Sequence, residues 1–153
     1  MTGIIKSIKI YPAKGETGLE AHEAKLLENL GLEWDFHAKG GERQISLLFA
    51  DNYINDQTRQ EQTKQDQTKQ GLCLSRFREN ISVHFPEPVA IQAGTRLETE
   101  ETVLEITGET KRCHEECPLY EAGKSCSLAG LNLFARVLKS GIIRKGERVI
   151  VDR

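Results

Sequence analysis

Short runs of apolar, often β-branched residues recur along most of the chain, and Gly or polar residues separate them. In the first run, residues 3–11, the even-numbered side chains from Ile4 onward would lie on one face of a strand that Pro12 ends. Further runs cover residues 43–49, 81–85, 95–99, 102–106 and 142–151. So many short strands, together with one or two helices, predict a largely antiparallel β-barrel or β-sandwich.

Three segments leave the choice between strand and helix open. In residues 19–30, four leucines suit a helix that Gly31 would cap, yet Leu26 and Leu27 could equally end a strand. Residues 131–138 fit either pattern, and a helix is expected to begin at Ala50. For residues 19–30 we expect strand, because pairing within a sheet often overrides such a weak helical signal.

The size and charge of the chain favour one cytoplasmic domain spanning residues 1–153. A chain of 153 residues with 38% hydrophobic and 29% charged residues can bury a core without disulfides or metals. A net charge of −2 gives no general attraction for nucleic acid or a membrane surface. The N-terminus has no apolar segment of the signal-peptide kind, and no run is long enough to span a bilayer.

Residues 57–71 form an internal repeat of three polar pentapeptides, QTRQE, QTKQD and QTKQG. None of them contains an apolar side chain, so they cannot offset the entropy of ordering, and a period of five matches neither a helix face nor a strand face. We therefore interpret the repeat as a surface insertion without a functional motif.

The chemically most distinctive segment is residues 111–126, which holds three of the four cysteines. Cys113 follows Lys111 and Arg112 and precedes His114, and Cys117 lies close behind. Cations next to a thiol lower its pKa, and the thiolate is the form that attacks electrophiles and binds soft metals. In the reducing cytosol such clustered thiols more often serve metal, redox or catalytic chemistry than disulfides.

The order and spacing of several short motifs resemble a stand-alone MOSC domain, the domain at the C-terminus of molybdenum cofactor sulfurases. The motifs are GLEWDFH at 31–37, RQISLL at 43–48, GLC at 71–73, FRENI at 77–81, GTRL at 94–97, KRCHEEC at 111–117, FARV at 134–137 and GIIRKGE at 141–147. Small bacterial members that also carry paired cysteines resemble this chain most. The resemblance covers nearly the whole chain apart from the pentapeptide repeat.

This resemblance implies a mainly β fold, a closed or partly open MOSC-type β-barrel with a few short helices and a cleft built by loops. It also implies that one thiol of the Cys113 and Cys117 pair is functional. Enzymes among the relatives use this thiol to hold molybdenum in a pterin-bound cofactor, and others are thought to carry sulfur for metal–sulfur chemistry. The sulfurase partners of the family use pyridoxal phosphate, but nothing in this chain looks like a pyridoxal-phosphate lysine site.

The resemblance implies two functions of different classes, and both need a reactive cysteine with cations nearby. One is a molybdenum–pterin binding protein that acts on N- or S-oxygenated small molecules and receives electrons from a separate donor protein. The other is a sulfur carrier that accepts persulfide sulfur from a cysteine desulfurase. Cys113 is the first choice for the thiol and Cys117 the second, while Lys111 and Arg112 supply positive potential for an anionic cofactor.

Three residues of the first half are candidates for cofactor contacts, each with a structural alternative. Asp35 and His37 either line the cleft, on one side of a strand, or are a satisfied turn carboxylate and a surface imidazole. Arg43 either binds a phosphate bidentately or forms an ion pair at the end of a strand. Glu79 and Asn80 are expected to fix a turn, and Arg136 is expected to be structural.

A zinc site is the third reading of the cysteines. Cys113, Cys117 and Cys126, with His114 or His37, supply zinc ligands, but the spacing lacks a second close pair of cysteines. Cys73, between two leucines, is expected to be a small buried apolar residue. The chain departs from the resemblance in three places: Trp34 stands where similar sequences usually have Gly, Glu147 where they usually have Asp, and the run at 127–134 differs from the one they often have after the third cysteine. The last departure touches the cleft side.

Overall fold

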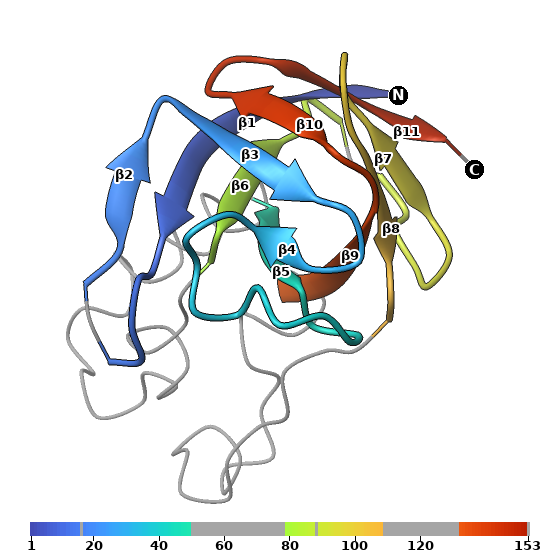
Figure 1. Ribbon diagram of the computed structural model, residues 1–153. Helices are drawn as coiled ribbons and strands as arrows, with labels where there is room; N and C mark the ends of the chain where they lie inside the picture. The colour runs from blue at the N-terminus through green and yellow to red at the C-terminus, as the bar shows by residue number, and fades with distance from the viewer. Residues whose placement is uncertain (16, 50–78, 88, 109–131, 153) are drawn as a thin grey trace, which may run out of the picture.

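The computed structural model describes residues 1–15, 17–49, 79–87, 89–108 and 132–152, and in these ranges the chain forms strands and no helix (Figure 1). In chain order the strands are β1 (Thr2–Ile10), β2 (Leu19–Ala21), β3 (Glu23–Leu27), β4 (Gly31–Leu32), β5 (Ile45–Phe49), β6 (Ile81–His84), β7 (Arg96–Glu98), β8 (Val103–Ile106), β9 (Asn132–Lys139), β10 (Gly141–Arg144) and β11 (Arg148–Asp152). Within this part of the chain no helix could cross a membrane.

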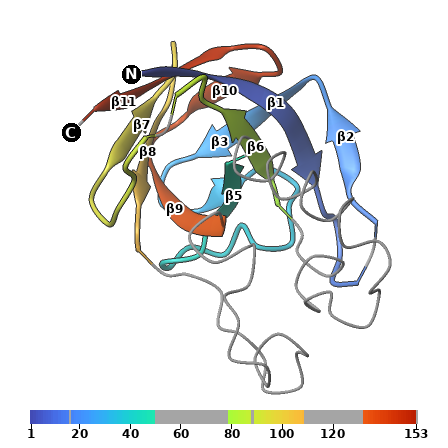
Figure 2. The same cartoon turned by 180° about the vertical axis from the view of Figure 1, so that it is seen from behind.

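Seven of these strands close into a mixed β-barrel, as the sequence predicts. The hydrogen-bonded order β11-β7-β8-β9-β5-β6-β1 is closed by pairing between β1 and β11, with Thr2 opposite Ile150. The neighbours in this ring run antiparallel except β5 and β6, which are parallel. Figure 2 shows the same ring from behind, and β2 adds to it at the end of β1.

A small second sheet, in the order β10-β3-β4, lies on one side of the barrel (Figures 1 and 2). Its buried side chains, among them Leu26, Leu32 and Ile143, belong to the same apolar core as those of the barrel strands. The small sheet therefore covers the barrel and extends its core. Residues 19–30, where the leucine pattern allowed a helix, are strand in β2 and β3, which confirms the expectation.

The first strand differs in one respect from its sequence pattern. Pairing with β6 shifts register between Ile5 and Ser7, so a β-bulge interrupts the alternation there. Before the bulge Gly3 and Ile5 are buried, and after it Ile8 is buried. The expectation that Ile4 and Ile8 share one face is wrong, because the extra residue of a bulge moves the following side chains to the other face.

The core of the barrel is filled by aliphatic side chains from the strands. The five residues of β5 are all buried, as expected for a short apolar run, and residues 131–138 contribute the long strand β9. A small apolar hollow inside the barrel is lined by core residues such as Ile5, Leu47 and Leu97. Because the interior is apolar and packed, polar chemistry has to lie at the ends of the strands.

Candidate functional site

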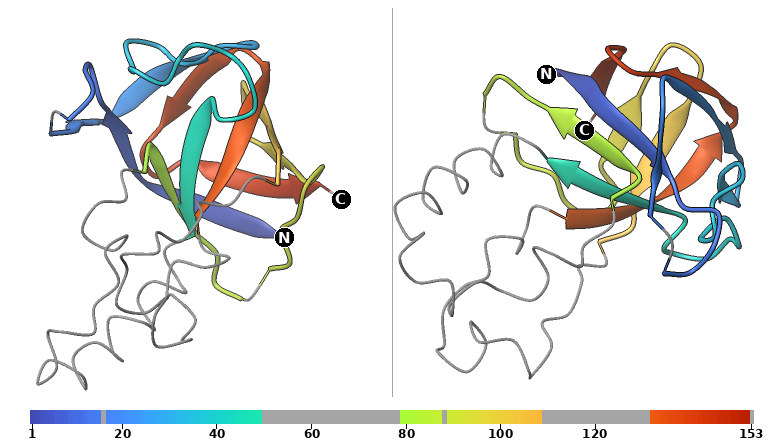
Figure 3. Two further views of the ribbon diagram at one scale, coloured as in Figure 1. Left: turned by 90° about the horizontal axis from the view of Figure 1, so that it is seen from below. Right: turned by 90° about the vertical axis from the view of Figure 1, so that its left-hand side faces the viewer.

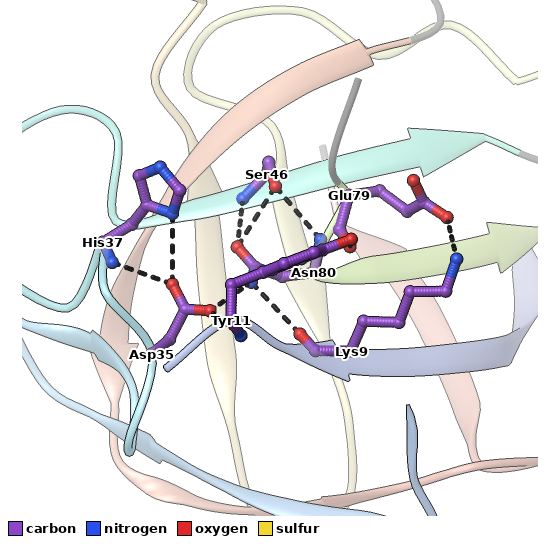
Figure 4. A network of polar contacts seen from close by, with 7 residues as sticks. All are labelled: Lys9, Tyr11, Asp35, His37, Ser46, Glu79 and Asn80. Atoms are coloured by element: carbon purple, nitrogen blue, oxygen red, sulfur yellow. Dashed lines mark hydrogen bonds and ion pairs between the residues drawn. The ribbon is translucent and has the colours of Figure 1, made fainter. Parts of the chain in front are cut away.

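The polar groups of the first half of the chain meet where β1 ends and where β5 and β6 begin. Pairing sets Ile8 of β1 and Leu47 of β5 opposite Ile81, the first residue of β6, so the three strands share this edge. Figure 3 shows β1, β5 and β6 side by side in two further directions. We call the polar residues at this edge the rim network; its members are Lys9, Tyr11, Asp35, His37, Ser46, Glu79 and Asn80 (Figure 4).

Asn80 is the centre of the rim network and is fully buried. Its Oδ1 accepts hydrogen bonds from the backbone N–H and the hydroxyl of Ser46, both at 3.1 Å. Its Nδ2 donates to the carbonyl oxygen of Lys9 at 3.2 Å and to Oδ1 of Asp35 at 2.9 Å. All hydrogen-bonding positions of this amide are used, which is the condition for burying it without a large penalty.

Asp35 is a buried carboxylate that four donors satisfy. Oδ1 accepts from the backbone N–H of Tyr11 at 2.8 Å and from Asn80; Oδ2 accepts from the backbone N–H of His37 at 2.9 Å and contacts its Nδ1 at 3.2 Å. Burial raises the pKa of Asp35 and is the largest single effect, but the hydrogen bonds from the His37 ring and from the Tyr11 and His37 backbone together lower its pKa below the usual 3.8. Asp35 is therefore ionised near neutral pH.

His37 is held by this carboxylate and remains accessible. The side chain is 46% exposed, and its ring packs edge-on against Phe36 with the centroids 5.0 Å apart. The contact between Nδ1 and Asp35 is a hydrogen bond when Nδ1 carries the proton, so the lone pair of neutral His37 lies on Nε2. Nε2 points away from Asp35 (Figure 4). Such an oriented imidazole can accept a proton, donate one when charged, or bind a ligand.

Lys9, Tyr11 and Glu79 complete the rim network. The ammonium of Lys9 lies 2.8 Å from Oε1 of Glu79, and this hydrogen bond is the main reason why the pKa of Lys9 is raised above 10.5. The hydroxyl of Tyr11 donates to the carbonyl oxygen of Glu79 at 3.1 Å. Both contacts join the end of β1 to the start of β6, so they fix the position at which the chain enters the barrel after residue 78.

Arg43 lies outside the rim network, on the exposed approach to β5. Its guanidinium carbon is 5.0 Å from the centroid of the Phe134 ring of β9. Thr107 follows β8 and joins both segments: its hydroxyl donates to the carbonyl oxygens of Glu42 at 2.9 Å and Phe134 at 3.1 Å. Thr107 therefore holds the residues that follow β8 beside the loop that carries Arg43, and Cys113 lies six residues further along the sequence.

Trp34 has an unusual backbone conformation next to the rim network. The backbone N–H of Asp35 donates to the carbonyl oxygen of Leu32 at 3.1 Å, which makes residues 32–35 a tight turn with Trp34 in third place. Trp34 has φ of +70°, and 78% of the residue is exposed. A positive φ in third place of such a turn favours glycine over a bulky residue.

The structure gives different outcomes for the residues named from the sequence. Asp35 and His37 lie in turns after β4 and not on a strand, and Asp35 has the satisfied carboxylate of the structural alternative. Asn80 does more than fix a turn, because it joins β1, β5 and Asp35. Arg136 pairs with Glu105 on the neighbouring strand, as a structural residue would. Roles in binding a cofactor remain predictions for Asp35, His37 and Arg43.

The remaining candidates lie outside the described residues. They are Cys73, Lys111, Arg112, Cys113, His114, Cys117 and Cys126. The helix expected at Ala50 and the pentapeptide repeat lie outside them as well. In the ranges that the structure describes, no three His, Cys, Asp or Glu side chains are grouped to hold a metal. Sequence reasoning missed Tyr11 and Ser46, whose contacts with Glu79 and Asn80 join segments far apart in the chain.

Comparison with known proteins identifies the fold. No protein-family model matches the sequence, and no curated protein matches it. Among solved structures, the YuaD protein from Bacillus subtilis matches with a TM-score of 0.64 over 99% of this chain and 96% of that one, at 15% identity. YiiM from Escherichia coli matches with 0.62 over 100% and 70%, and YiiM from Geobacillus stearothermophilus with 0.61 over 99% and 75%, both at 14% identity. These likenesses establish a shared fold.

Proposed function

We propose that this chain is a MOSC-type protein that binds a molybdenum–pterin cofactor, with the thiolate of Cys113 as the metal ligand. Two independent findings support the proposal. The motif order of the sequence resembles MOSC domains, and the barrel resembles YuaD and YiiM, which fit a MOSC-type fold. When bound, such a cofactor supplies oxygen-atom transfer chemistry for N- or S-oxygenated small molecules.

The observation that carries the proposal is the contact between Thr107 and the loop of Arg43. Through its bonds to Glu42 and Phe134, Thr107 joins the end of β8 to this loop. Gly108, the next residue, lies at this edge, and Lys111, Arg112 and Cys113 follow it closely in the sequence. A soft metal with an anionic pterin needs this combination of thiolate and cations.

The described residues fit an anionic cofactor with hydrogen-bonding edges. Arg43 has an exposed guanidinium whose plane suits a phosphate, and its contact with the Phe134 ring limits its motion. His37 offers an oriented Nε2, and Asp35, satisfied by its four donors, keeps that orientation. In this proposal Arg43 binds the phosphate, His37 donates or accepts one hydrogen bond, and Lys111 and Arg112 lower the pKa of the nearby thiol.

The experiment is to produce the full chain in a host that makes molybdenum cofactor, and to measure bound metals and the pterin fluorescence released on denaturation. We expect molybdenum and pterin in the wild type. Cys113→Ser should abolish molybdenum retention while the fold stays intact, because a hydroxyl is a poor donor to a soft metal. Its melting temperature should equal that of wild type produced without cofactor. Cys117→Ser should have a smaller effect, and Cys73→Ser serves as the matched control thiol.

Other outcomes would overturn the proposal in defined ways. A wild type without metal that carries a persulfide on Cys113 would make the chain a sulfur carrier. Zinc in the wild type, lost equally in Cys113→Ser, Cys117→Ser and Cys126→Ser, would make the cysteine segment a structural metal site. The reverse ranking of Cys113 and Cys117 would move the ligand to Cys117.

A further inference from the structure

Trp34 adopts a backbone conformation that costs free energy. A bulky residue at φ of +70° is a conformational outlier, because its Cβ crowds the backbone in the left-handed region. The other non-glycine residue with positive φ in the described ranges is Asn29, and asparagine tolerates this region far better. Glycine would form the same turn after Leu32 without strain.

Packing within the described part of the chain does not offset this cost. The residue is 78% exposed, so folding buries little of the indole. Among the described aromatic and cation–π contacts, its neighbours Phe36 and His37 pack on each other and Lys39 lies over Phe36, while Trp34 takes part in none. A strained residue that the fold does not require indicates a functional role.

The surroundings of Trp34 favour a small ring-shaped ligand over a protein partner. A protein interface is usually centred on a contiguous apolar patch, but Trp34 lies between the acidic residues Glu33 and Asp35. The nearby ring of Phe36 is half-buried and contacts the polar side chains of His37 and Lys39. An exposed aromatic side chain offers a flat face on which a planar heteroaromatic ring can stack. Tryptophan also offers the largest face for stacking.

We infer that Trp34 is a stacking surface for a fused nitrogen heteroaromatic ring of the pterin or purine type. This inference rests on the proposed function for one of its two ring types, since a molybdenum–pterin cofactor contains a pterin. It adds to that function a contact made by a residue whose conformation the turn itself does not require. His37, fixed by Asp35, supplies the nearest oriented hydrogen-bonding group along the chain.

The chain has a single tryptophan, so its fluorescence reports on Trp34 alone. Neopterin and guanosine monophosphate are titrated separately into the full-length protein, with absorbance corrected against free tryptophan amide, and binding is confirmed by calorimetry. We expect saturable quenching by at least one of the two. In Trp34→Gly the Kd, measured by calorimetry, should rise about 5- to 150-fold, the range that corresponds to one lost stacking contact.

Two further variants make the result specific. Trp34→Phe keeps a smaller aromatic face and should lose only part of the affinity. Leu19→Ser removes another exposed apolar side chain, from β2, and should leave Kd within about twofold of wild type, as expected for a residue outside the contact. Trp34→Gly should melt no lower than wild type, because glycine adopts this φ without strain.

Three results would overturn the inference. The first is no saturable binding of either probe, and the second is an unchanged Kd in Trp34→Gly. The third is a Trp34 fluorescence change that depends on protein concentration and accompanies dimer formation in solution, because the indole would then be covered by a second copy of the chain. Failure of the proposed function looks different. Binding of a probe without molybdenum retention would retain the stacking surface and reject the cofactor. If Trp34→Gly retains molybdenum with the same pterin content as wild type and its Kd for the probes is unchanged, the cofactor is retained and the stacking surface is rejected.

Discussion

At the scale of single residues, the rim network combines a carboxylate, an amide and an imidazole in fixed positions. Asn80 and Asp35 are buried and fully hydrogen-bonded, while His37, held by Asp35, reaches solvent. Buried polar groups of this kind are costly to disturb, because a substitution leaves the remaining partners buried with fewer hydrogen bonds than they make in the intact network. The network therefore stabilises the edge of the barrel and orients the one group at its surface.

The first prediction concerns acid stability. The pKa of folded Asp35 is lowered below 3.8, so its contribution to the free energy of unfolding is complete above that pH and is lost as pH falls through the folded value. The difference in unfolding free energy between wild type and Asp35→Asn should stay constant from neutral pH down to about pH 5 and shrink below pH 4. Urea unfolding at a series of pH values measures it. A difference that is independent of pH down to the acid limit would contradict the assigned shift.

The second prediction concerns the strain at Trp34. Relieving the left-handed conformation of a bulky residue should raise the free energy of unfolding by roughly 1–2 kcal/mol. The greater flexibility of glycine in the unfolded chain lowers it by about 0.5–1 kcal/mol. Trp34→Gly should therefore be as stable as wild type or more stable by about 1 kcal/mol, whereas Trp34→Ala, which keeps the strain, should gain nothing. Thermal and urea unfolding of the three proteins compares them. A Trp34→Gly protein less stable than Trp34→Ala would reject the strain.

At the scale of elements, β4 leads from the small sheet into the loop that carries Asp35 and His37, and Gly31 is its first residue. Gly31 has φ of +137°, and a Cβ there would lie 2.8 Å from the carbonyl oxygen of Gln44 and 3.2 Å from Cα of Ala38. Both atoms belong to backbone that cannot move without disturbing the approach to β5. Gln44 itself is buried and accepts a hydrogen bond from the backbone N–H of Val137 at 2.9 Å.

The third prediction follows from this close approach. Gly31→Ala should destabilise the protein by about 2–4 kcal/mol, because it adds a backbone clash to an unfavourable φ. Gly41→Ala is the matched control, since Gly41 also has positive φ, +83°, but no atom lies within 4 Å of its would-be Cβ. The control should lose only about 1–2 kcal/mol. Equal losses of unfolding free energy in the two variants would mean that the backbone moves to relieve the clash between the new Cβ and the carbonyl oxygen of Gln44 at little cost.

The strands were more predictable from the sequence than the site was. Alternation and β-branched residues predict β1, β5, β6 and the β7–β8 hairpin, because these signals are local. The bulge in β1 depends on how β6 pairs with it, and residues 31–37 predict neither the buried Asp35 nor the link to Asn80. Such contacts join segments that are distant in the chain, so no local pattern contains them. Trp34 alone carried a local signal, as a bulky residue in the place of a turn glycine.

At the scale of the whole molecule, β5 and β6 are the parallel neighbours in the barrel, and the chain between them includes the pentapeptide repeat. Parallel neighbours require a crossover connection of a dozen or more residues, which residues 50–80 supply with length to spare. The topology therefore requires a connection here and does not require the repeat.

The fourth prediction tests this point. Replacing residues 57–70 with a short Gly/Ser linker should change the free energy of unfolding by no more than about 1 kcal/mol, because loop closure depends weakly on length. A Gly/Ser replacement of full length separates the effect of sequence from that of length. Loss of cooperative unfolding, or of the cofactor binding proposed above, would give the repeat a role.

The pairing of β1 with β11 closes the barrel with the first and last strands that the structure describes. Thr2 lies opposite Ile150, and the backbone N–H of Val151 donates to the carbonyl oxygen of Met1 at 3.0 Å.

Contacts between β1 and β11, which are so distant in sequence, carry the largest loop-closure entropy, so this seam should form after the rate-limiting step of folding. Val149→Ala should then mainly speed unfolding, whereas Leu104→Ala, in the local β7–β8 hairpin, should slow folding; chevron plots separate the two. The lifetime of the folded barrel would thus be set where its two ends meet, and its rate of assembly elsewhere.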